Sequence, residues 1–312
     1  MPRSLAMEIL SALASAHRAG AHRHEDGPES EREFKIGEFQ RLEVAGPFDV
    51  EVETGGSPSV RATGPEWALE NLSIEHEDDR LFIGCDGDCD GDVRIMVTVG
   101  QLQAVRSSGS GDISIERIKG ELFECMSSGS GDVAIDEIKV DRLRLSAAGS
   151  GDIRIDKARA TEFETTLMGS GDLSADAVES AEFKLTMNGS GDAHIEDYCG
   201  DFFHAVLTGS GDLAVEALES RTVECSVFGS GDVFIGRGGA KEAKLETAGS
   251  GDISSEDLEV EEVSLSVCGS GDISARATEH AEVVVMGSGD VSLTGGAKCT
   301  ARGSGSGEVR CS

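Results

Sequence analysis

Hydrophobic and polar positions alternate along most of this chain, and the alternation repeats every twenty residues. The tetrapeptide Gly-Ser-Gly-Asp marks the start of each repeat, and the last repeats follow at a spacing of eighteen. The repeats begin at Gly109, Gly129, Gly149, Gly169, Gly189, Gly209, Gly229, Gly249, Gly269 and Gly287, and at Gly305 with Glu in place of Asp. Self-similarity at a fixed period indicates an architecture of stacked structural repeats.

Each repeat predicts two strands. Counted from its first Gly, a repeat carries apolar residues at positions 5 and 7, such as Ile113 and Ile115. Apolar residues return at positions 15, 17 and 19, such as Phe183, Leu185 and Met187. A period of two places such side chains on one face of a strand. We therefore expect strands near positions 4 to 8 and 14 to 20, with one more apolar contact at position 10.

These strands predict an all-β fold. A repeat of twenty residues cannot bury its own apolar face, so successive repeats must stack in register, with parallel hydrogen bonding at ~4.8 Å. We predict a single-stranded parallel β-helix (a β-solenoid) of about 20 residues per coil, right-handed as parallel crossovers are. Gly-Ser-Gly is expected to form a sharp corner, where glycine tolerates positive φ and close backbone approach.

The sequence signatures of two other repeat architectures are absent. A leucine-rich horseshoe has a similar period, but it requires Asn or Cys after a Leu-x-x-Leu-x-Leu strand. A propeller blade requires about forty residues and a Trp-Asp pair. Neither pattern occurs in this chain.

Three regions follow from the pattern. Residues 101–312 are predicted to form the regular solenoid, and residues 34–100 its N-terminal cap and first irregular coils, because an open solenoid end exposes unpaired strand edges. Within the cap, Pro65 to Asn71 predicts a helical turn. Residues 1–33 are predicted to be a leader. Its apolar stretch from Leu5 to Ala16 resembles a cleaved signal peptide or an amphipathic helix, and residues 17–33 read as disordered.

The charge of the chain limits the kinds of molecule that it can bind. Asp and Glu number 59 against 27 Lys and Arg, which gives a formal net charge of −32. Such a field repels nucleic acid and anionic headgroups and favours cations and basic partners. No run of eighteen apolar residues occurs, so we expect no helical membrane span.

The repeats and the segment before them resemble the autotransporter adhesin head domain known as the GIN family. The similarity rests on the segment from Phe39 to Val50, the strand Leu81-Phe82-Ile83, the serial Gly-Ser-Gly-Asp coils and the ending from Gly287 to Cys311. The resemblance implies a β-helical fold and a surface or periplasmic location in an exported bacterial protein. This chain departs from the family in its long run of near-identical repeats.

Position 4 of the repeats forms a predicted column of carboxylates, which is the first candidate site. Its members are Asp112, Asp132, Asp152, Asp172, Asp192, Asp212, Asp232, Asp252 and Asp272. They could cap their own corners by accepting backbone N–H bonds, or bind calcium. Catalysis by a carboxylate pair is disfavoured, because it needs one acid with a raised pKa in a pocket rather than a repeated array.

A second candidate cation site is the loop containing Asp86, Asp88, Asp90 and Asp92, which matches the start of an EF-hand calcium loop. The twelfth residue is Val97 where that motif requires Glu, so a polar loop tip is the alternative. We expect no other cofactor.

Eight cysteines suggest two disulfides. Cys85 with Cys89 and Cys299 with Cys311 are the candidate pairs. Cys125 and Cys225 share an inward column five coils apart, about 24 Å at strand spacing, which is too far to bridge.

The sequence therefore predicts a non-enzymatic, exported, acidic solenoid that acts as an adhesin-like or cell-envelope scaffold, with a protein or polysaccharide of the envelope as its partner. A cytoplasmic location stays open, as does the oligomeric state. A polymerising, filament-forming scaffold is one alternative. A polysaccharide-active β-helix enzyme is the other, although such enzymes bear long loops and these coils carry no insertions.

Overall fold

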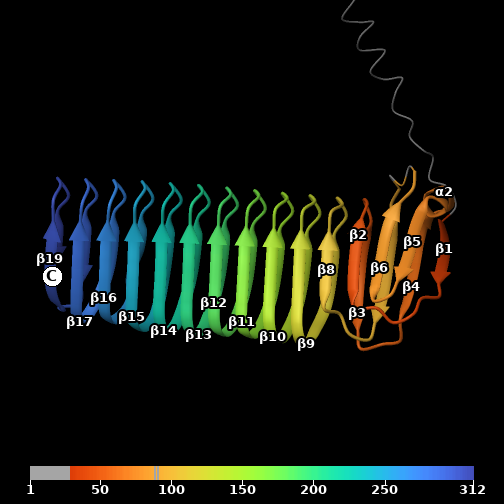
Figure 1. Cartoon of the computed structure of the whole chain (residues 1–312), viewed down its shortest axis with the longest axis horizontal. Coiled ribbons are helices and arrows are strands. Elements are labelled where there is room, and N and C mark those ends of the chain that lie inside the picture. The colour runs from red at the N-terminus through yellow and green to blue at the C-terminus, as the bar shows by residue number, and fades with distance from the viewer. Residues whose placement is uncertain (1–28, 88, 90) are drawn as a thin grey trace, which may run out of the picture.

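The computed structural model describes residues 29–312 except residues 88 and 90, and it confirms the predicted β-solenoid. About ten turns of roughly 20 residues stack into an elongated rod, in which the strands of successive turns lie side by side and their corners line up along one long edge (Figure 1). Within the described residues, no helix has both the length and the apolarity that crossing a membrane requires.

Each regular coil is one long, bent strand paired in parallel with its neighbours twenty residues away. Ile135, for example, is in register with Ile115 and Ile155. The eight strands of the regular coils are β9 (Ile113–Ser127), β10 (Val133–Ala147), β11 (Ile153–Leu167), β12 (Leu173–Met187), β13 (Ala193–Leu207), β14 (Leu213–Val227), β15 (Val233–Thr247) and β16 (Ile253–Val267).

Burial divides each coil into three inward-facing segments rather than two. In β10 the buried positions are 5 and 7, then 10 and 12, then 15, 17 and 19. Two adjacent outward residues separate these groups and mark the bends, as Asp141 and Arg142 do at the second one. Position 12 does not stand out in the sequence, because its residues are of mixed type, such as Gly120, Val140 and Ser180.

Aromatic side chains stack along position 15. The ring centroids of Phe163 and Phe183 lie 5.0 Å apart, and those of Phe183 and Phe203 lie 5.1 Å apart. Tyr198, at position 10, packs against Phe183 and Phe203, and its hydroxyl donates to the carbonyl oxygens of Ser180 and Phe202. Burial raises the pKa of Tyr198 to about 12. Like residues therefore pack on like in successive coils, as the period predicts.

Close contact between coils explains the corner glycines. A Cβ on Gly149 would lie 1.9 Å from the carbonyl oxygen of Gly129, and one on Gly151 would lie 2.1 Å from that of Gly131. The positive φ expected from the sequence is wrong for these corners, because the described glycines with positive φ are Gly55, Gly120, Gly238, Gly295 and Gly296. Glycine is required there because a side chain has no space.

An irregular cap precedes the regular coils. Its elements are β1 (Glu29–Phe34), β2 (Arg41–Ala45), β3 (Asp49–Thr54), β4 (Ser59–Pro65), α2 (Glu66–Glu70), β5 (Leu72–Glu77), β6 (Arg80–Cys85), β7 (Arg94–Val99) and β8 (Ala104–Ser107). The predicted helical turn is present as α2, with Pro65 as its N-cap residue.

Antiparallel pairs form the outer end of the cap. Strand β1 pairs with β4, and β5 pairs with β6. The prediction that residues 17–33 are disordered is therefore wrong for Glu29–Glu33, whose alternating pattern pairs with β4. The predicted signal segment and the rest of the leader lie outside the described residues.

Within the cap, strands β2 and β3 already pair in parallel, as the regular coils do. Strand β2 lies in parallel between β6 and β8, and β3 lies between β7 and β9. The turn between them, Gly46 to Asp49, stacks under the first Gly-Ser-Gly-Asp corner, because Gly109 lies against Gly46 and Gly111 against Phe48.

The last coils are shorter. Strand β17 (Ile273–Val285) has 13 residues instead of 15, and its register against β16 shifts at the bends. The chain then continues through β18 (Val291–Thr294), β19 (Lys298–Gly303) and β20 (Val309–Cys311). The spacing of eighteen in the sequence is thus absorbed at the bends, which leaves the Gly-Ser-Gly corners in line.

Candidate functional site

The position-4 carboxylates form a continuous ladder of hydrogen bonds. Oδ1 of Asp112 accepts the backbone N–H of Asp132 at 2.9 Å, and Oδ1 of Asp172 accepts that of Asp192 at 2.8 Å. The same bond recurs in every coil and joins, in order, Asp49, Asp112, Asp132, Asp152, Asp172, Asp192, Asp212, Asp232, Asp252, Asp272, Asp290 and Glu308. We call this set the Asp ladder.

A backbone hydrogen bond accompanies each side-chain hydrogen bond of the Asp ladder. The carbonyl oxygen of Asp132 accepts the N–H of Ile113 at 2.8 Å, while the N–H of Asp132 donates to the side chain of Asp112. The sequence pattern suggested that each Asp would cap its own corner. The donor lies instead in the next coil, because in-register stacking brings that N–H within reach of the carboxylate.

Three members of the Asp ladder were missed from the sequence. Asp49 begins it, and Asp290 and Glu308 end it. The available signal was the segment Gly46-Pro47-Phe48-Asp49-Val50, which aligns with Gly109-Ser110-Gly111-Asp112-Ile113. Pro and Phe in place of Ser and Gly concealed this equivalence.

Shallow grooves follow the Asp ladder. One, of about 430 Å³, is lined by Asp132, Asp152, Asp172 and Asp192 together with position-6 residues such as Ser174 and His194. On the other side of position 6 lies a second acidic column at position 8. Arg154 reaches into this column, 3.3 Å from Asp156 and 3.2 Å from Asp176. The whole face is therefore an extended acidic surface rather than a closed pocket.

The predicted calcium loop is partly described. Asp86 donates its backbone N–H to the carbonyl oxygen of Asn71, and the carboxylate of Asp92 lies 3.6 Å from Arg94. Both side chains are exposed, and Asp88 and Asp90 lie outside the described residues. The Asp92 carboxylate thus has a protein partner, whereas the contact of Asp86 is made by its main chain.

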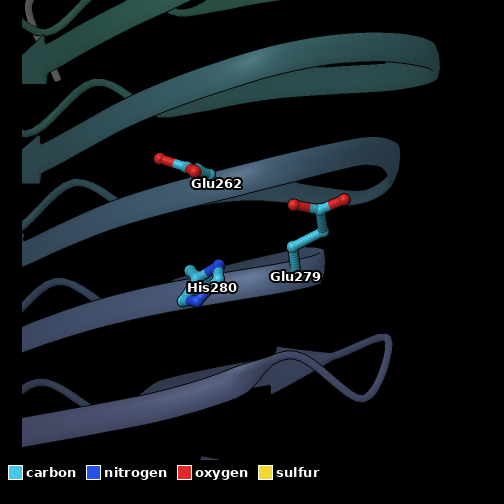
Figure 2. A group of neighbouring side chains, drawn as sticks. All are labelled: Glu262, Glu279 and His280. Atoms are coloured by element: carbon cyan, nitrogen blue, oxygen red, sulfur yellow. The ribbon is translucent and has the colours of Figure 1, made fainter.

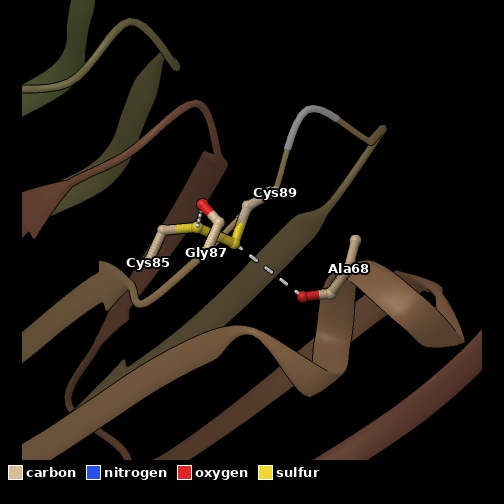
Figure 3. Close-up of a disulfide and its surroundings, with 4 residues drawn as sticks. All are labelled: Ala68, Cys85, Gly87 and Cys89. Atoms are coloured by element: carbon tan, nitrogen blue, oxygen red, sulfur yellow. Dashed lines mark hydrogen bonds between the residues drawn. A yellow bond between two sulfur atoms is a disulfide. The ribbon is translucent and has the colours of Figure 1, made fainter. Parts of the chain in front are cut away.

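Cys85 and Cys89 form a disulfide beside this loop, with 6.3 Å between their Cα atoms (Figure 3). Cys89 is buried, and its sulfur lies 3.9 Å from the carbonyl oxygen of Ala68 in α2. The bridge therefore fixes the start of the loop against the helix of the cap.

Cys299 and Cys311 form a second disulfide, between β19 and β20, with 6.5 Å between their Cα atoms. Cys125 and Cys225 are free and fully buried, and burial raises the pKa of each thiol to about 12. These two cysteines serve as small core residues and not as reactive thiols.

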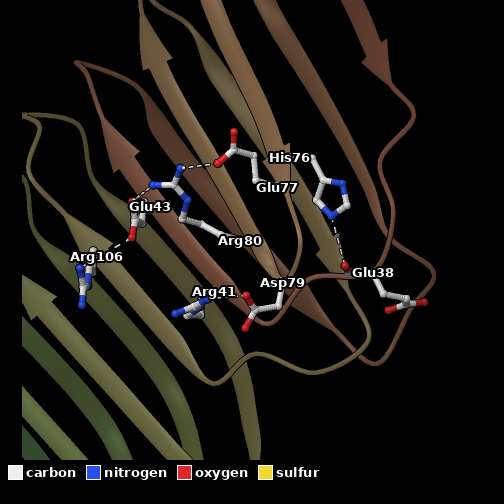
Figure 4. Close-up of polar contacts among 8 residues, drawn as sticks. All are labelled: Glu38, Arg41, Glu43, His76, Glu77, Asp79, Arg80 and Arg106. Carbon is white, nitrogen blue, oxygen red and sulfur yellow. Dashed lines mark hydrogen bonds and ion pairs between the residues drawn. The ribbon is translucent and has the colours of Figure 1, made fainter.

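A cluster of ion pairs connects strands within the cap (Figure 4). Arg80 of β6 lies 3.0 Å from Glu43 of β2 and 3.3 Å from Glu77, and these contacts raise its pKa. Arg41 donates to Asp79, and this hydrogen bond lowers the pKa of the Asp79 carboxyl. The cluster is a structural connection between β2, β5 and β6.

One group in the described part of the chain has the geometry of a metal site without having been predicted. Single ligand atoms of Glu262, Glu279 and His280 lie within 4.8 Å of one another on β16 and β17 (Figure 2). In the sequence, this group could have been found from a Glu that lies one coil before an adjacent Glu-His pair. All three residues are exposed, and Lys298 is the next residue in register with His280. Because a lysine there opposes a bound cation, we assign no metal to this group.

One family model matches most of the chain. A model of the family described as "Putative auto-transporter adhesin, head GIN domain" matches residues 38–198 and 196–297. No curated protein matches the chain.

Solved bacterial structures align with nearly the whole chain at low identity. A "putative adhesin" from Parabacteroides distasonis is 20% identical, with a TM-score of 0.40 over 92% of this chain and 98% of that one. One from Bacteroides fragilis is 18% identical, with a TM-score of 0.38 over 91% and 97%. A "putative lipid binding protein" from Parabacteroides distasonis is 21% identical, with a TM-score of 0.35 over 92% and 99%.

Proposed function

Because the chain belongs to the GIN-domain family, we propose that it is a non-enzymatic, adhesin-like binding protein exported to the cell envelope. Its partner in this proposal is a protein or a polysaccharide of the envelope. The family is named for adhesins, and adhesins bind other molecules.

The Asp ladder is the observation that supports binding rather than catalysis. Every internal rung has the same carboxylate, the same backbone N–H donor and the same preceding Gly-Ser-Gly, with donor–acceptor distances of 2.7 to 2.9 Å from Asp132 to Asp290. A catalytic pair needs two carboxyl groups in different environments, so that one is an acid and the other a base. A repeated surface instead suits an extended or multivalent partner, because equivalent contacts add along its length.

The acidic face also supports the proposal that the protein binds calcium. Each ladder carboxylate uses Oδ1 for the N–H of the next coil, which leaves Oδ2 outside that bond. Carboxylate oxygens are hard ligands suited to Ca²⁺, and like charges in a column favour counter-ions. Calcium bridging to an anionic envelope component is one way in which such a face could adhere.

End-to-end polymerisation is the weaker alternative. Strand β5 pairs antiparallel with β6 at the N-terminal end of the stack, so on this face a second copy would meet an edge of opposite direction. Electron microscopy of the purified chain tests this alternative, since filaments would support it and single rods would not.

A binding assay tests the main proposal. Purified full chain is incubated with sedimented envelope from the native host, with and without calcium, and bound protein is measured. We expect saturable retention and no release of reducing ends from acidic polysaccharides. Failure to bind any envelope fraction, or measurable turnover of a polysaccharide, would contradict the proposal.

A further inference from the structure

One strip of the solenoid surface is free of charge apart from a single residue. The strip consists of the outward side chains at positions 18, 20 and 2 of the coils, from Ser108 to Ser288, and we call it the uncharged band. Glu246 is its only charged member, although the chain has a formal net charge of −32. Position 2 is Ser in every coil, and positions 18 and 20 hold mainly Ser, Thr, Ala and Met.

Exposed apolar side chains gather in the same strip. The described part of the chain has seven large hydrophobic residues that are exposed, and five of them belong to the uncharged band. They are Met126, Met168, Phe228, Val284 and Met286, with exposed fractions between 37% and 56%. They belong to four different repeats, so the band presents apolar side chains at intervals along its length rather than as one continuous patch.

Charged columns border the uncharged band on both sides. Position 16 carries alternating ion pairs, such as Arg144 with Glu124 at 3.3 Å and Lys184 with Glu164 at 3.7 Å. Position 4 carries the Asp ladder. The lack of charge is therefore a local property of the band and does not reflect the general surface composition.

The shape of the band favours a narrow, linear occupant. Nine coil spacings from Ser108 to Ser288 make it about 43 Å long, whereas positions 18 and 20 span only about 7 Å of strand. Adding the serine corner gives a contact area on the order of 400 Å², which is well below the ~800 Å² per partner of a stable protein interface. Two copies of so acidic a chain would also repel each other.

We propose that the uncharged band binds a neutral polysaccharide chain along the axis of the solenoid. This inference deepens the proposed function, on which it rests, by naming the class of partner. Rows of Ser and Thr hydroxyls can donate to and accept from sugar hydroxyls, while Met168 and Phe228 offer apolar surface to the C–H faces of the rings. A neutral polymer fits because docking on the band buries no unpaired charge apart from that of Glu246.

Retention on insoluble polymers tests the inference. The purified full chain is mixed with cellulose and chitin as neutral probes and with polygalacturonate beads as an anionic probe, all in high salt. A chelator is added so that calcium cannot bridge the Asp ladder to the anionic probe, and we expect retention on at least one neutral polymer and none on polygalacturonate. Met168→Glu and Phe228→Glu should each weaken that retention by about tenfold, which corresponds to about 1.4 kcal/mol.

Phe234→Glu is the matched control, because Phe234 is 42% exposed against 48% for Phe228 but lies at position 6, outside the band. It should leave retention unchanged. Equal losses in Phe228→Glu and Phe234→Glu, or a dimer in sedimentation that Phe228→Glu dissociates, would overturn the inference. Binding to native envelope without binding to any neutral polymer would also overturn it, and would leave the proposed function intact. Binding to neither the native envelope nor a neutral polymer would contradict both the inference and the proposed function.

Discussion

Oδ1 of Asp172 accepts the backbone N–H of Asp192 at 2.8 Å, so the side chain of one coil is hydrogen-bonded to the main chain of the next. The relationship is repeated from Asp49 to Glu308. It makes the Asp ladder part of the stacking of the coils as well as a charged surface. These two roles can be separated by mutation.

Replacing Asp172 with Asn or with Ala should separate them. Asn keeps an oxygen acceptor for the N–H of Asp192 and removes one charge from the column, whereas Ala removes both. We expect Asp172→Ala to lose about 1 kcal/mol of unfolding free energy, and Asp172→Asn to be as stable as the wild type or more so. Urea unfolding measures both, and equal stability of the two variants would show that the hydrogen bond contributes nothing.

Calcium should stabilise the protein more than sodium does. A divalent cation relieves repulsion along the Asp ladder better than a monovalent one at matched ionic strength. We expect millimolar calcium to raise the Tm, and the triple variant Asp172→Asn, Asp192→Asn, Asp212→Asn to show a smaller increment. Identical shifts of Tm with calcium and sodium would remove cation binding from the proposal.

The position-15 core should be sensitive to truncation. Phe183 is fully buried and contacts Phe163, Phe203 and Tyr198. Phe183→Ala should lower the unfolding free energy by about 3–5 kcal/mol, because a large cavity forms between coils. Phe202→Ala is the control, since Phe202 lies next to this column but faces outward and is half-buried. It should lose much less, and comparable losses would show that the inward face is misassigned.

The corner glycines should not accept a side chain. A Cβ at Gly149 would clash with the carbonyl oxygen of Gly129, so Gly149→Ala should destabilise by about 1–3 kcal/mol through displacement of the coils. At Gly239 the nearest atom to an added Cβ is 3.5 Å away, so Gly239→Ala should be neutral or stabilise by up to about 1 kcal/mol. Thermal and urea unfolding of the two variants compares the sites, and tolerance of Gly149→Ala would disprove the close-packing explanation.

High pH should unfold the protein partly through Tyr198. Burial raises its pKa from 10.0 to about 12, so the folded state holds the phenolic proton more tightly than the unfolded state does. The resulting stabilisation is fully present below pH 10 and is lost as the pH rises through about 12. Tyr198→Phe should start less stable, because it lacks the hydrogen bonds to Ser180 and Phe202, but lose less stability over that range. Parallel pH profiles of the two proteins would contradict this prediction.

Much of the fold could be predicted because the sequence repeats. Most residues at positions 5, 7, 10, 15, 17 and 19 are apolar, and a period of two within a period of twenty permits few other packings. Position 12 was hidden by its small residues, such as Gly120 and Ala160. Strand β1 could not be predicted because Glu29–Phe34 is mostly charged. It is a strand because it pairs with β4.

The candidate site was predicted less fully than the fold. The sequence identified the ladder carboxylates as a column, but the donor of each bond is a backbone N–H twenty residues away, which no local pattern specifies. Similarly, Glu262 and His280 lie in one coil and the next, and only the register of β16 against β17 makes them neighbours.

By itself, the sequence determined the coil length, the inward residues of the two main strand segments, the acidic column and the family to which the chain belongs, because each of these is a property of one repeat or of its period. The tertiary structure alone decided the third inward segment, the direction of the Asp ladder bonds, the clash that requires glycine at the corners and the collection of exposed Met and Phe residues into one band. These depend on the close approach of neighbouring coils, and that distance is set by hydrogen bonding between coils rather than by any residue within one of them.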